Sequence, residues 1–212
     1  MKIAVLGASG RTGLLVTRAA MDRSDEVTAV VRSPQRFEGL WSGGESPRVV
    51  AADARDEEAL TEAFRGQDAV AFCLGSGRGD SHTIHRSAMQ TCLAAMRATG
   101  VARIVALSAS GMVVQGDDPL TRYLAKPLVG RLLRDHFADL VAMEALLTGS
   151  TLRWTVVRPP RLTNRRGDGR YRQRRDGNVR WGFFLSRSDL ALSIVDALHD
   201  DTTVKVCVSV AG

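Results

Sequence analysis

Three glycines near the start of the chain have the spacing of a phosphate-binding turn. The segment Gly7-Ala8-Ser9-Gly10-Arg11-Thr12-Gly13 follows a short apolar run and precedes an amphipathic stretch. A strand must turn tightly at the first glycine, approach a pyrophosphate closely at the second, and pack against its helix at the third. The N–H groups and positive dipole end of that helix then face the phosphates. We therefore expect dinucleotide binding at Gly7, Ser9, Gly10, Arg11, Thr12 and Gly13, with a plain strand-to-helix turn as the alternative.

The residues after the second apolar run distinguish two forms of such a cofactor. Binding of NAD would favour Asp or Glu there, but this chain has Arg32, with Arg36 close behind. A guanidinium binds a phosphate in a bidentate manner, whereas a carboxylate would repel it. Arg11 adds a second cation inside the glycine loop. The sequence favours NADP (NADPH) over NAD, unless Arg32 is only a solvated residue at a strand end.

The polar residue Asp53, followed by Ala54, comes after the third apolar run. Asp53 could accept a hydrogen bond from the adenine amino group, or it could cap the next helix. Asp56 is the better placed of the two aspartates for the cap. Both roles of Asp53 remain open at this point, and we include Asp53 and Ala54 among the expected cofactor-binding residues.

These positions lie in an alternating pattern of short β-branched runs and amphipathic stretches. The runs are residues 2–6, 27–31, 49–51, 69–73, 104–107, 152–157 and 204–208, and the stretches lie near 12–22, 56–65, 81–99, 134–148 and 188–199. Such alternation predicts an α/β fold with a doubly wound, mostly parallel, Rossmann-like sheet. Residues 111–131 and 159–187 interrupt the pattern after strands, which predicts long loops over the carboxyl edge of the sheet, where ligands bind.

Composition is that of one globular domain spanning residues 1–212. The apolar fraction is 44% and the charged fraction is 25%, which are ordinary values. Cys73, Cys92 and Cys207 are far apart, so we expect neither a disulfide framework nor a zinc site, and a reducing cytoplasm as the location. His82 and His85 are three residues apart but have no evident third ligand, so we expect no metal. No apolar stretch of about 18 residues is present, so we expect no membrane span.

The net charge of +6 is concentrated in one segment. Residues 161–187 hold nine arginines and two aspartates, a local balance of +7, which leaves −1 for the remainder. Aromatic side chains are interleaved there at Tyr171, Trp181, Phe183 and Phe184. The segment could be a nucleic-acid arm, a lid over an anionic aromatic substrate, or a solvated loop. Its expected place at the ligand edge favours a small molecule over nucleic acid, and the solvated loop remains open.

Further motifs follow the later strands: Leu74-Gly75-Ser76, Ser108-Ala109-Ser110 and Arg158-Pro159-Pro160. With the glycine loop and Asp53, they resemble the atypical short-chain dehydrogenase/reductase superfamily, and within it the biliverdin-IXβ/flavin reductase-like group. The resemblance covers essentially the whole chain. It implies that Leu74, Gly75 and Ser76 pass along the nicotinamide ribose and pyrophosphate. It also implies that Ser108 and Ser110 flank the nicotinamide, with Ser110 at the position of the catalytic serine; both could instead only satisfy loop backbone.

The chain departs from that superfamily at its usual acid, the Tyr of Tyr-x-x-x-Lys. Tyr123 and Lys126 have the spacing Tyr-x-x-Lys and precede Pro127, which is more typical of a loop than of a catalytic helix. Tyr123 is therefore retained only as a catalytic candidate beside His136, which corresponds to a histidine in the resembled reductases. His136 could supply a proton near neutral pH, or it could be an exposed residue at a helix start.

Together the residues predict an NADPH-dependent oxidoreductase that delivers hydride to an aromatic, anionic acceptor such as a flavin. The alternative is a non-catalytic NADP-binding redox sensor, which the missing Tyr-x-x-x-Lys favours. An epimerase or dehydratase acting on nucleotide sugars would need that acid and a larger substrate domain. We expect a small-molecule partner and neither nucleic acid nor membrane, and the oligomeric state stays open.

Overall fold

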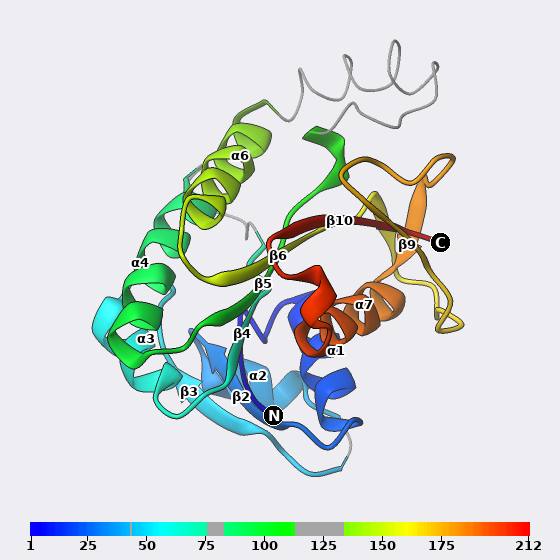
Figure 1. The fold of residues 1–212 in the computed structure, drawn as a ribbon. Coiled ribbons are helices and arrows are strands. Elements are labelled where there is room, and N and C mark those ends of the chain that lie inside the picture. Colours follow the sequence, from blue (N-terminus) through cyan, green and yellow to red (C-terminus); the bar gives the residue numbers. More distant parts are fainter. Residues whose placement is uncertain (43, 76–82, 113–133) are drawn as a thin grey trace.

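The computed structural model describes residues 1–42, 44–75, 83–112 and 134–212. Its main feature is an eight-stranded sheet with the order β3-β2-β1-β4-β5-β6-β10-β8 (Figure 1). The strands run parallel except β8, which pairs antiparallel with β10. The fold class expected from the sequence is thereby confirmed. The strand bounds are β1 Lys2–Leu6, β2 Glu26–Val31, β3 Arg48–Ala51, β4 Ala69–Phe72, β5 Arg103–Leu107, β6 Arg153–Arg158, β8 Arg172–Arg175 and β10 Val206–Ala211.

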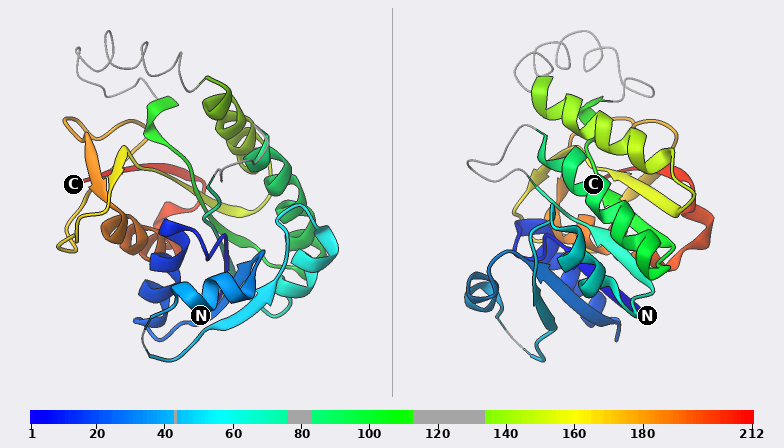
Figure 2. Two further views of the ribbon diagram at one scale, coloured as in Figure 1. Left: turned by 180° about the vertical axis from the view of Figure 1, so that it is seen from behind. Right: turned by 90° about the vertical axis from the view of Figure 1, so that its left-hand side faces the viewer.

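Helices cover both faces of this sheet, as Figures 1 and 2 show. One face carries α3 (Glu57–Phe64), α4 (Ile84–Thr99) and α6 (Arg134–Thr148), and the other carries α1 (Arg11–Met21) and α7 (Arg187–His199). The short helix α2 (Pro34–Leu40) contributes Phe37 to the same core as α1 and α7. Two 3-10 turns, η1 (Ser110–Met112) and η3 (Asp201–Thr203), are also present in the described part of the chain. In the described part of the chain, the helices are too short or too polar to cross a membrane.

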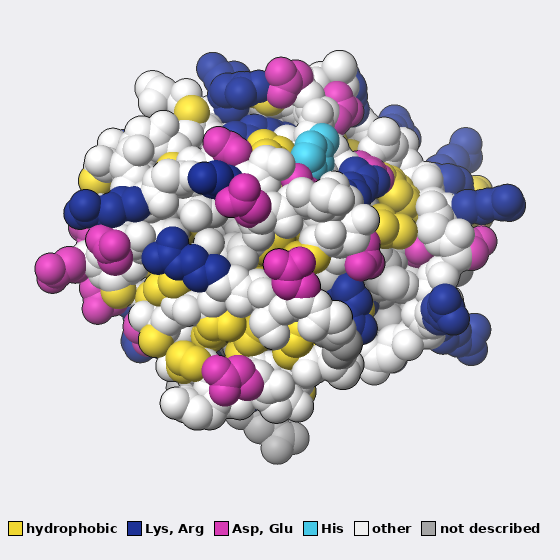
Figure 3. Space-filling view, turned by 90° about the horizontal axis from the view of Figure 1, so that it is seen from below, with side chains coloured by type: hydrophobic (Ala, Val, Ile, Leu, Met, Phe, Trp, Pro, Cys, Tyr) yellow, Lys and Arg dark blue, Asp and Glu magenta, His cyan; other side chains and the backbone are white. Residues whose placement is uncertain are grey.

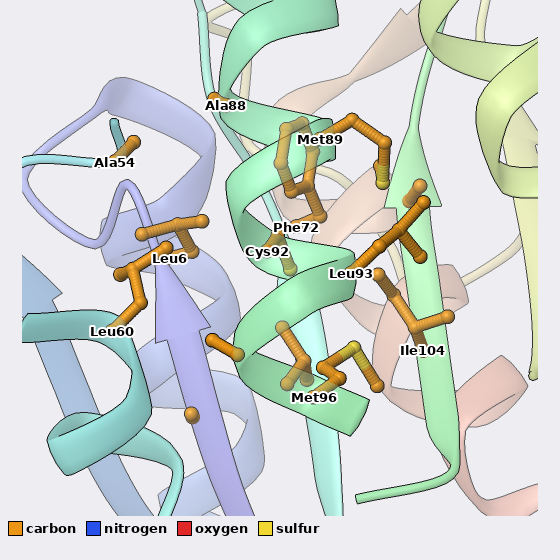
Figure 4. Packing of buried hydrophobic residues seen from close by; sticks show 14 of the residues in the cluster. Leu6, Ala54, Leu60, Phe72, Ala88, Met89, Cys92, Leu93, Met96 and Ile104 are labelled. Atoms are coloured by element: carbon orange, nitrogen blue, oxygen red, sulfur yellow. The ribbon is translucent and has the colours of Figure 1, made fainter. Parts of the chain in front are cut away.

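Burial on both faces explains why the strands are apolar along their whole length. Every residue of β4 is buried, and two apolar clusters lie on opposite sides of the sheet. Figure 4 shows one of them, where Phe72, Met89, Leu93 and Ile104 pack between α4 and the neighbouring strands. A strand covered on both faces has no polar side to alternate with its apolar side. The apolar runs of the sequence therefore located the strands well.

Side chains cap the starts of α2, α3 and α7. The Asp56 side chain accepts a hydrogen bond from the backbone N–H of Ala59 at 3.0 Å and begins α3. Asp56 is thus the cap, as the sequence indicated. Ser33 caps α2, and Ser186 caps α7 by accepting from the N–H of Asp189. The sequence pattern did not predict α2, because seven residues with one buried side chain give no helical periodicity.

The segment 159–187, expected as a long loop, contains three short strands. β7 (Arg161–Thr163) and β9 (Phe184–Ser186) form a parallel pair, and β8 extends the main sheet. All four residues of β8 are exposed, so the sequence shows no apolar alternation there and only the pairing with β10 makes it a strand. Charged side chains on an edge strand oppose pairing with other chains. On the face in Figure 3, basic and acidic side chains are interspersed.

An ion pair attaches α6 to the carboxyl end of β6. Arg158 donates to Glu144 through both Nε and Nη2, and the Nε–Oε1 distance is 3.0 Å. The two side chains are only 17% and 10% exposed. Removing one partner of such a pair leaves the other charge poorly solvated. The pair therefore holds the helix in one position against the sheet.

We expect Glu144→Gln to lower the free energy of unfolding by about 2–3 kcal/mol, because Arg158 then stays largely buried without a counter-ion. Glu62→Gln is the matched control, since the Glu62–Arg65 pair is 66% and 70% exposed and such pairs contribute about 0.5 kcal/mol or less. Chemical denaturation measures both variants. Equal losses in the two would contradict the role given to Glu144.

Candidate functional site

A cleft of about 650 Å³ opens at the carboxyl ends of β1, β2, β4 and β5. The strand order reverses between β1 and β4, and ligands of doubly wound folds bind at such a switch point. The expected residues that line the cleft are Gly7, Ser9, Gly10, Arg11, Thr12, Arg32, Asp53, Ala54, Leu74, Gly75, Ser108 and His136. The tertiary structure thus brings together residues from six separate stretches of the chain.

The glycine loop is shaped by contacts that leave no room for side chains. Gly7 has φ +84°, and a Cβ there would lie 2.9 Å from the carbonyl oxygen of Cys73. A Cβ on Gly13 would lie 2.2 Å from the carbonyl oxygen of Gly7, which is far inside van der Waals contact. Gly10 is the N-cap of α1 and no side chain caps this helix start. The N-terminus of α1 therefore opens directly onto the cleft, as an anion-binding helix end requires.

Positive charge predominates along the described lining of the cleft. Four arginines line it, Arg11, Arg32, Arg36 and Arg187, against one aspartate. That aspartate, Asp53, accepts hydrogen bonds from Arg55 Nε at 2.9 Å and Arg55 Nη2 at 3.0 Å. These bonds, aided by the charge of Arg32, lower the pKa of Asp53 to about 2. Asp53 is thus a carboxylate beside Arg32, and the cleft suits an anionic ligand.

Arg187 was not among the residues expected to bind cofactor. It begins α7 and also donates to Asn164 Oδ1. Burial, and then the charge of Arg11, lowers its pKa, so the two guanidiniums lie near enough to repel each other. An anion between them would relieve this repulsion. In the sequence, only the position of Arg187 after a strand at the carboxyl edge could have indicated that it faces a bound anion.

Of the two serines after β5, the structure places one at the cleft. Ser108 lines it, is 8% exposed, and has a buried Oγ without a hydrogen-bond partner among the described residues. Leaving a buried hydroxyl unpaired costs free energy, so this Oγ marks a position for a polar ligand group. Ser110 lies in η1, where its N–H donates to Pro159 and its carbonyl accepts from Asn178. Ser110 does not belong to the described lining of the cleft.

Two histidines line the cleft beside Leu140. His136, expected from the sequence, lies in the first turn of α6, and its ring centroid is 5.4 Å from that of His85. His85 was considered in the sequence only as a metal ligand, and its partner Asp139 is 54 residues away. No sequence spacing could have joined these two residues. Ser76, Tyr123, Lys126 and His82 lie outside the described residues.

Comparison with known proteins identifies the family. An NAD(P)H-binding family matches residues 7–201. The chain belongs to this NAD(P)H-binding family. The match confirms the NAD(P)-binding, Rossmann-type family expected from the sequence, and it covers the glycine loop and nearly all of the cleft lining.

One relative and two solved structures match nearly the whole chain at low identity. The chain is 25% identical over 208 residues to YhfK of Bacillus subtilis (strain 168), which is named as an uncharacterized sugar epimerase. The match covers 96% of this chain and 90% of YhfK. A candidate NADH-flavin reductase from Streptococcus pneumoniae TIGR4 superposes with TM-score 0.79 at 23% identity, over 100% of this chain and 99% of its own. A short-chain dehydrogenase/reductase from Veillonella parvula DSM 2008, in complex with NADP, superposes with TM-score 0.80 at 18% identity. The superposition covers 100% of this chain and 94% of that chain. Both structures share the fold.

The residues present fit a dinucleotide. The glycine loop packs too closely against neighbouring backbone to admit a Cβ, the helix start that follows it has no side-chain cap, and Ser108 Oγ has no partner among the described residues. The uncapped helix end and the unpaired hydroxyl are the two features that a bound phosphate or amide group would satisfy. The fit rests on the shape and polarity of the site itself.

We expect Gly13→Ala to weaken NADPH binding about tenfold or more and to lower the free energy of unfolding by about 1–3 kcal/mol. Its new methyl group would displace the Gly7 carbonyl and move α1 away from the phosphates. Gly39→Ala in α2 is the control, because a Cβ there meets nothing within 4 Å. NADPH fluorescence titration and thermal unfolding measure both. An unchanged affinity in Gly13→Ala would refute the proposed packing constraint.

Proposed function

We propose that this protein is an NADPH-dependent reductase of an aromatic, anionic acceptor such as a flavin. The observation that carries the proposal is the cleft at the switch point, where four arginines and a single aspartate line the described walls. NADPH and flavin nucleotides both carry phosphate groups, which such a cleft attracts. The family match supports the NAD(P)H part of the proposal, and the arginines support the choice of NADPH.

Each part of the cleft has a role in this proposal. The N-terminus of α1 and Arg11 bind the pyrophosphate, with Arg187 on its other side. Arg32 and Arg36 bind the 2′-phosphate, and Asp53 lies at the adenosine end. Leu74 and Gly75 pass along the nicotinamide ribose, and Ser108 Oγ meets a polar group at the nicotinamide end. Bound NADPH supplies a hydride, and the protein orients the acceptor against it and excludes water.

The arginines of β8 have a different position from those of the cleft. Of the segment 159–187, only Leu162 and Arg187 belong to the described cleft lining. Arg174 and Arg175 instead contact the Asn178 carbonyl and the Thr202 hydroxyl. Arg187 is therefore the residue of this segment that we propose to act on the ligand. The acceptor itself is proposed from the charge and size of the cleft.

A second candidate function is an NADP-binding sensor that does not turn over. The described cleft-facing residues of α6 are His136 and Leu140, four residues apart, and neither is the Tyr or Lys of the superfamily's usual pair. A sensor needs only the cofactor half of the cleft. This candidate keeps the glycine loop and Arg32 in the same roles.

Turnover with chosen acceptors separates the two functions. NADPH oxidation is followed at 340 nm with FMN and with menadione, beside a fluorescence titration of NADPH binding. The reductase proposal expects steady NADPH oxidation that depends on enzyme and acceptor. Tight NADPH binding with no oxidation by either acceptor would instead support the sensor.

We expect Arg32→Glu to weaken NADPH binding by about 10–100-fold, because a charge-assisted hydrogen bond to the 2′-phosphate is lost and replaced by repulsion. NADH has no such phosphate and should lose far less. Arg170→Glu makes the same charge change outside the described cleft lining and controls for long-range effects. Fluorescence titrations of both nucleotides provide the measurement, and equal losses for NADPH and NADH in Arg32→Glu would disprove the assignment.

A further inference from the structure

Two imidazoles from different helices face the same part of the cleft. His85 comes from the first turn of α4 and His136 from the first turn of α6, and the rings meet edge to face with centroids 5.4 Å apart. Both line the cleft together with Ser108. The His85 side chain is only 2% exposed. A buried imidazole at the wall of a ligand cleft is positioned for proton exchange with a ligand.

Asp139 holds the inner side of this pair. Its Oδ2 lies 2.8 Å from His85 Nδ1, and it also accepts from the backbone N–H of His85 at 2.9 Å. Its Oδ1 accepts from the backbone N–H of Arg86, likewise at 2.9 Å. Because Nδ1 donates to this carboxylate, His85 exchanges protons through Nε2. The carboxylate is buried as well, with a side chain 2% exposed, so this contact fixes the orientation of the ring.

The surroundings of His136 act against protonation of its ring. Burial, and then the charge of His85, lowers the pKa of His136, whereas Asp139 acts on it in the opposite direction. The protonation of His136 is therefore coupled to the charge of its neighbour.

We propose that His85, oriented by Asp139, and His136 form the proton donor for the acceptor reduced in this cleft. The inference rests on the proposed reductase function. His85 and His136 are then catalytic residues, and Asp139 is a positioning residue that acts through His85. The pair takes the place of the tyrosine–lysine acid of the superfamily.

The proton balance of the reduction requires such a donor. A two-electron reduction adds two electrons and two protons to the acceptor, and the hydride from NADPH supplies both electrons and one of those protons. The second comes from an imidazolium Nε–H: that N–H bond breaks, an O–H or N–H bond forms on the acceptor, and a neutral imidazole remains. A proton from solvent restores the imidazolium before the next turnover. The sum is NADPH, acceptor and one proton giving NADP⁺ and the reduced acceptor.

A purely structural role for the same residues has to be separated from this one. Asp139 joins α6 to the start of α4, so His85 could serve only to hold the two helices together. His85→Asn retains an N–H donor near Asp139 but carries no proton that it can release near neutral pH. His199→Asn is the matched control, because His199 Nε2 lies 2.9 Å from Asp25 Oδ2 in a second His–Asp pair. His199 does not line the described cleft.

The experiment compares the parent protein with His85→Asn, His136→Asn and His199→Asn. Menadione reduction is measured across pH to separate kcat from KM, NADPH affinity is measured by fluorescence, and stability by thermal unfolding. We expect kcat of His85→Asn to fall about 100-fold and its pH profile to flatten, with NADPH affinity unchanged. His136→Asn should lower kcat and shift the pH profile, and His199→Asn should match the parent.

A readout without turnover comes from NMR titration of the histidine rings in the nucleotide-free protein. The His136 ring should titrate below its ordinary pKa in the parent and closer to it in His85→Asn, because the charge of His85, one of the two influences that lower this pKa, is removed. If His85→Asn does not fold, His136→Asn and the parent titration carry the test.

The experiment distinguishes failure of the proposed reductase function from failure of the proton-donor assignment. If the parent binds NADPH and reduces no acceptor, the proposed function fails and the inference fails with it. If the parent turns over while His85→Asn keeps the kcat and pH profile of His199→Asn, the reductase stands and the proton donor is refuted. A normal pKa for His136, unchanged by His85→Asn, would likewise overturn the coupling of the rings.

Discussion

The close approach of α1 to the first turn is the constraint on which the cleft depends. Gly13 allows the helix to lie against the carbonyl of Gly7, where a Cβ would be 2.2 Å away. This contact places the N-terminus of α1 at the carboxyl end of β1, beside the reversal of strand order. The arginines, the serine after β5 and the two histidines all line the space that this approach leaves. A helix displaced outward by one methyl group would direct its N–H groups away from that space.

The wall of the cleft that His85 and His136 line depends on buried polar contacts of α6 with its neighbours. Asp139 links α6 to the first turn of α4, and the ion pair of Glu144 with Arg158 links the same helix to β6. α6 is therefore held at two positions along its length, and His136 lies just before the first of them. Buried charges of this kind are costly unless fully paired, so the geometry that pairs them is strongly preferred. The position of the imidazoles is a consequence of that preference.

Sequence patterns predicted most elements because the sheet is covered on both sides. The helix pattern near 134–148 coincides with α6, and the central strands fall within a few residues of the apolar runs. The pattern failed where tertiary pairing creates the element. The strand β8 has four exposed residues and exists through its pairing with β10, and α2 is too short for a periodic signal. The segment expected as one basic loop is for this reason divided by strands.

By itself, the sequence determined the α/β fold, the glycine loop and the dinucleotide family, because these depend on local spacing: glycines three residues apart, and apolar runs between amphipathic stretches. Only the tertiary structure decided which polar residues share the cleft. Arg187 joins Arg11 from the far end of the chain, Ser108 faces the cleft while Ser110 does not, and Asp139 meets His85 across 54 residues. Contacts between distant segments arise from how helices pack on the sheet, and no local pattern encodes them.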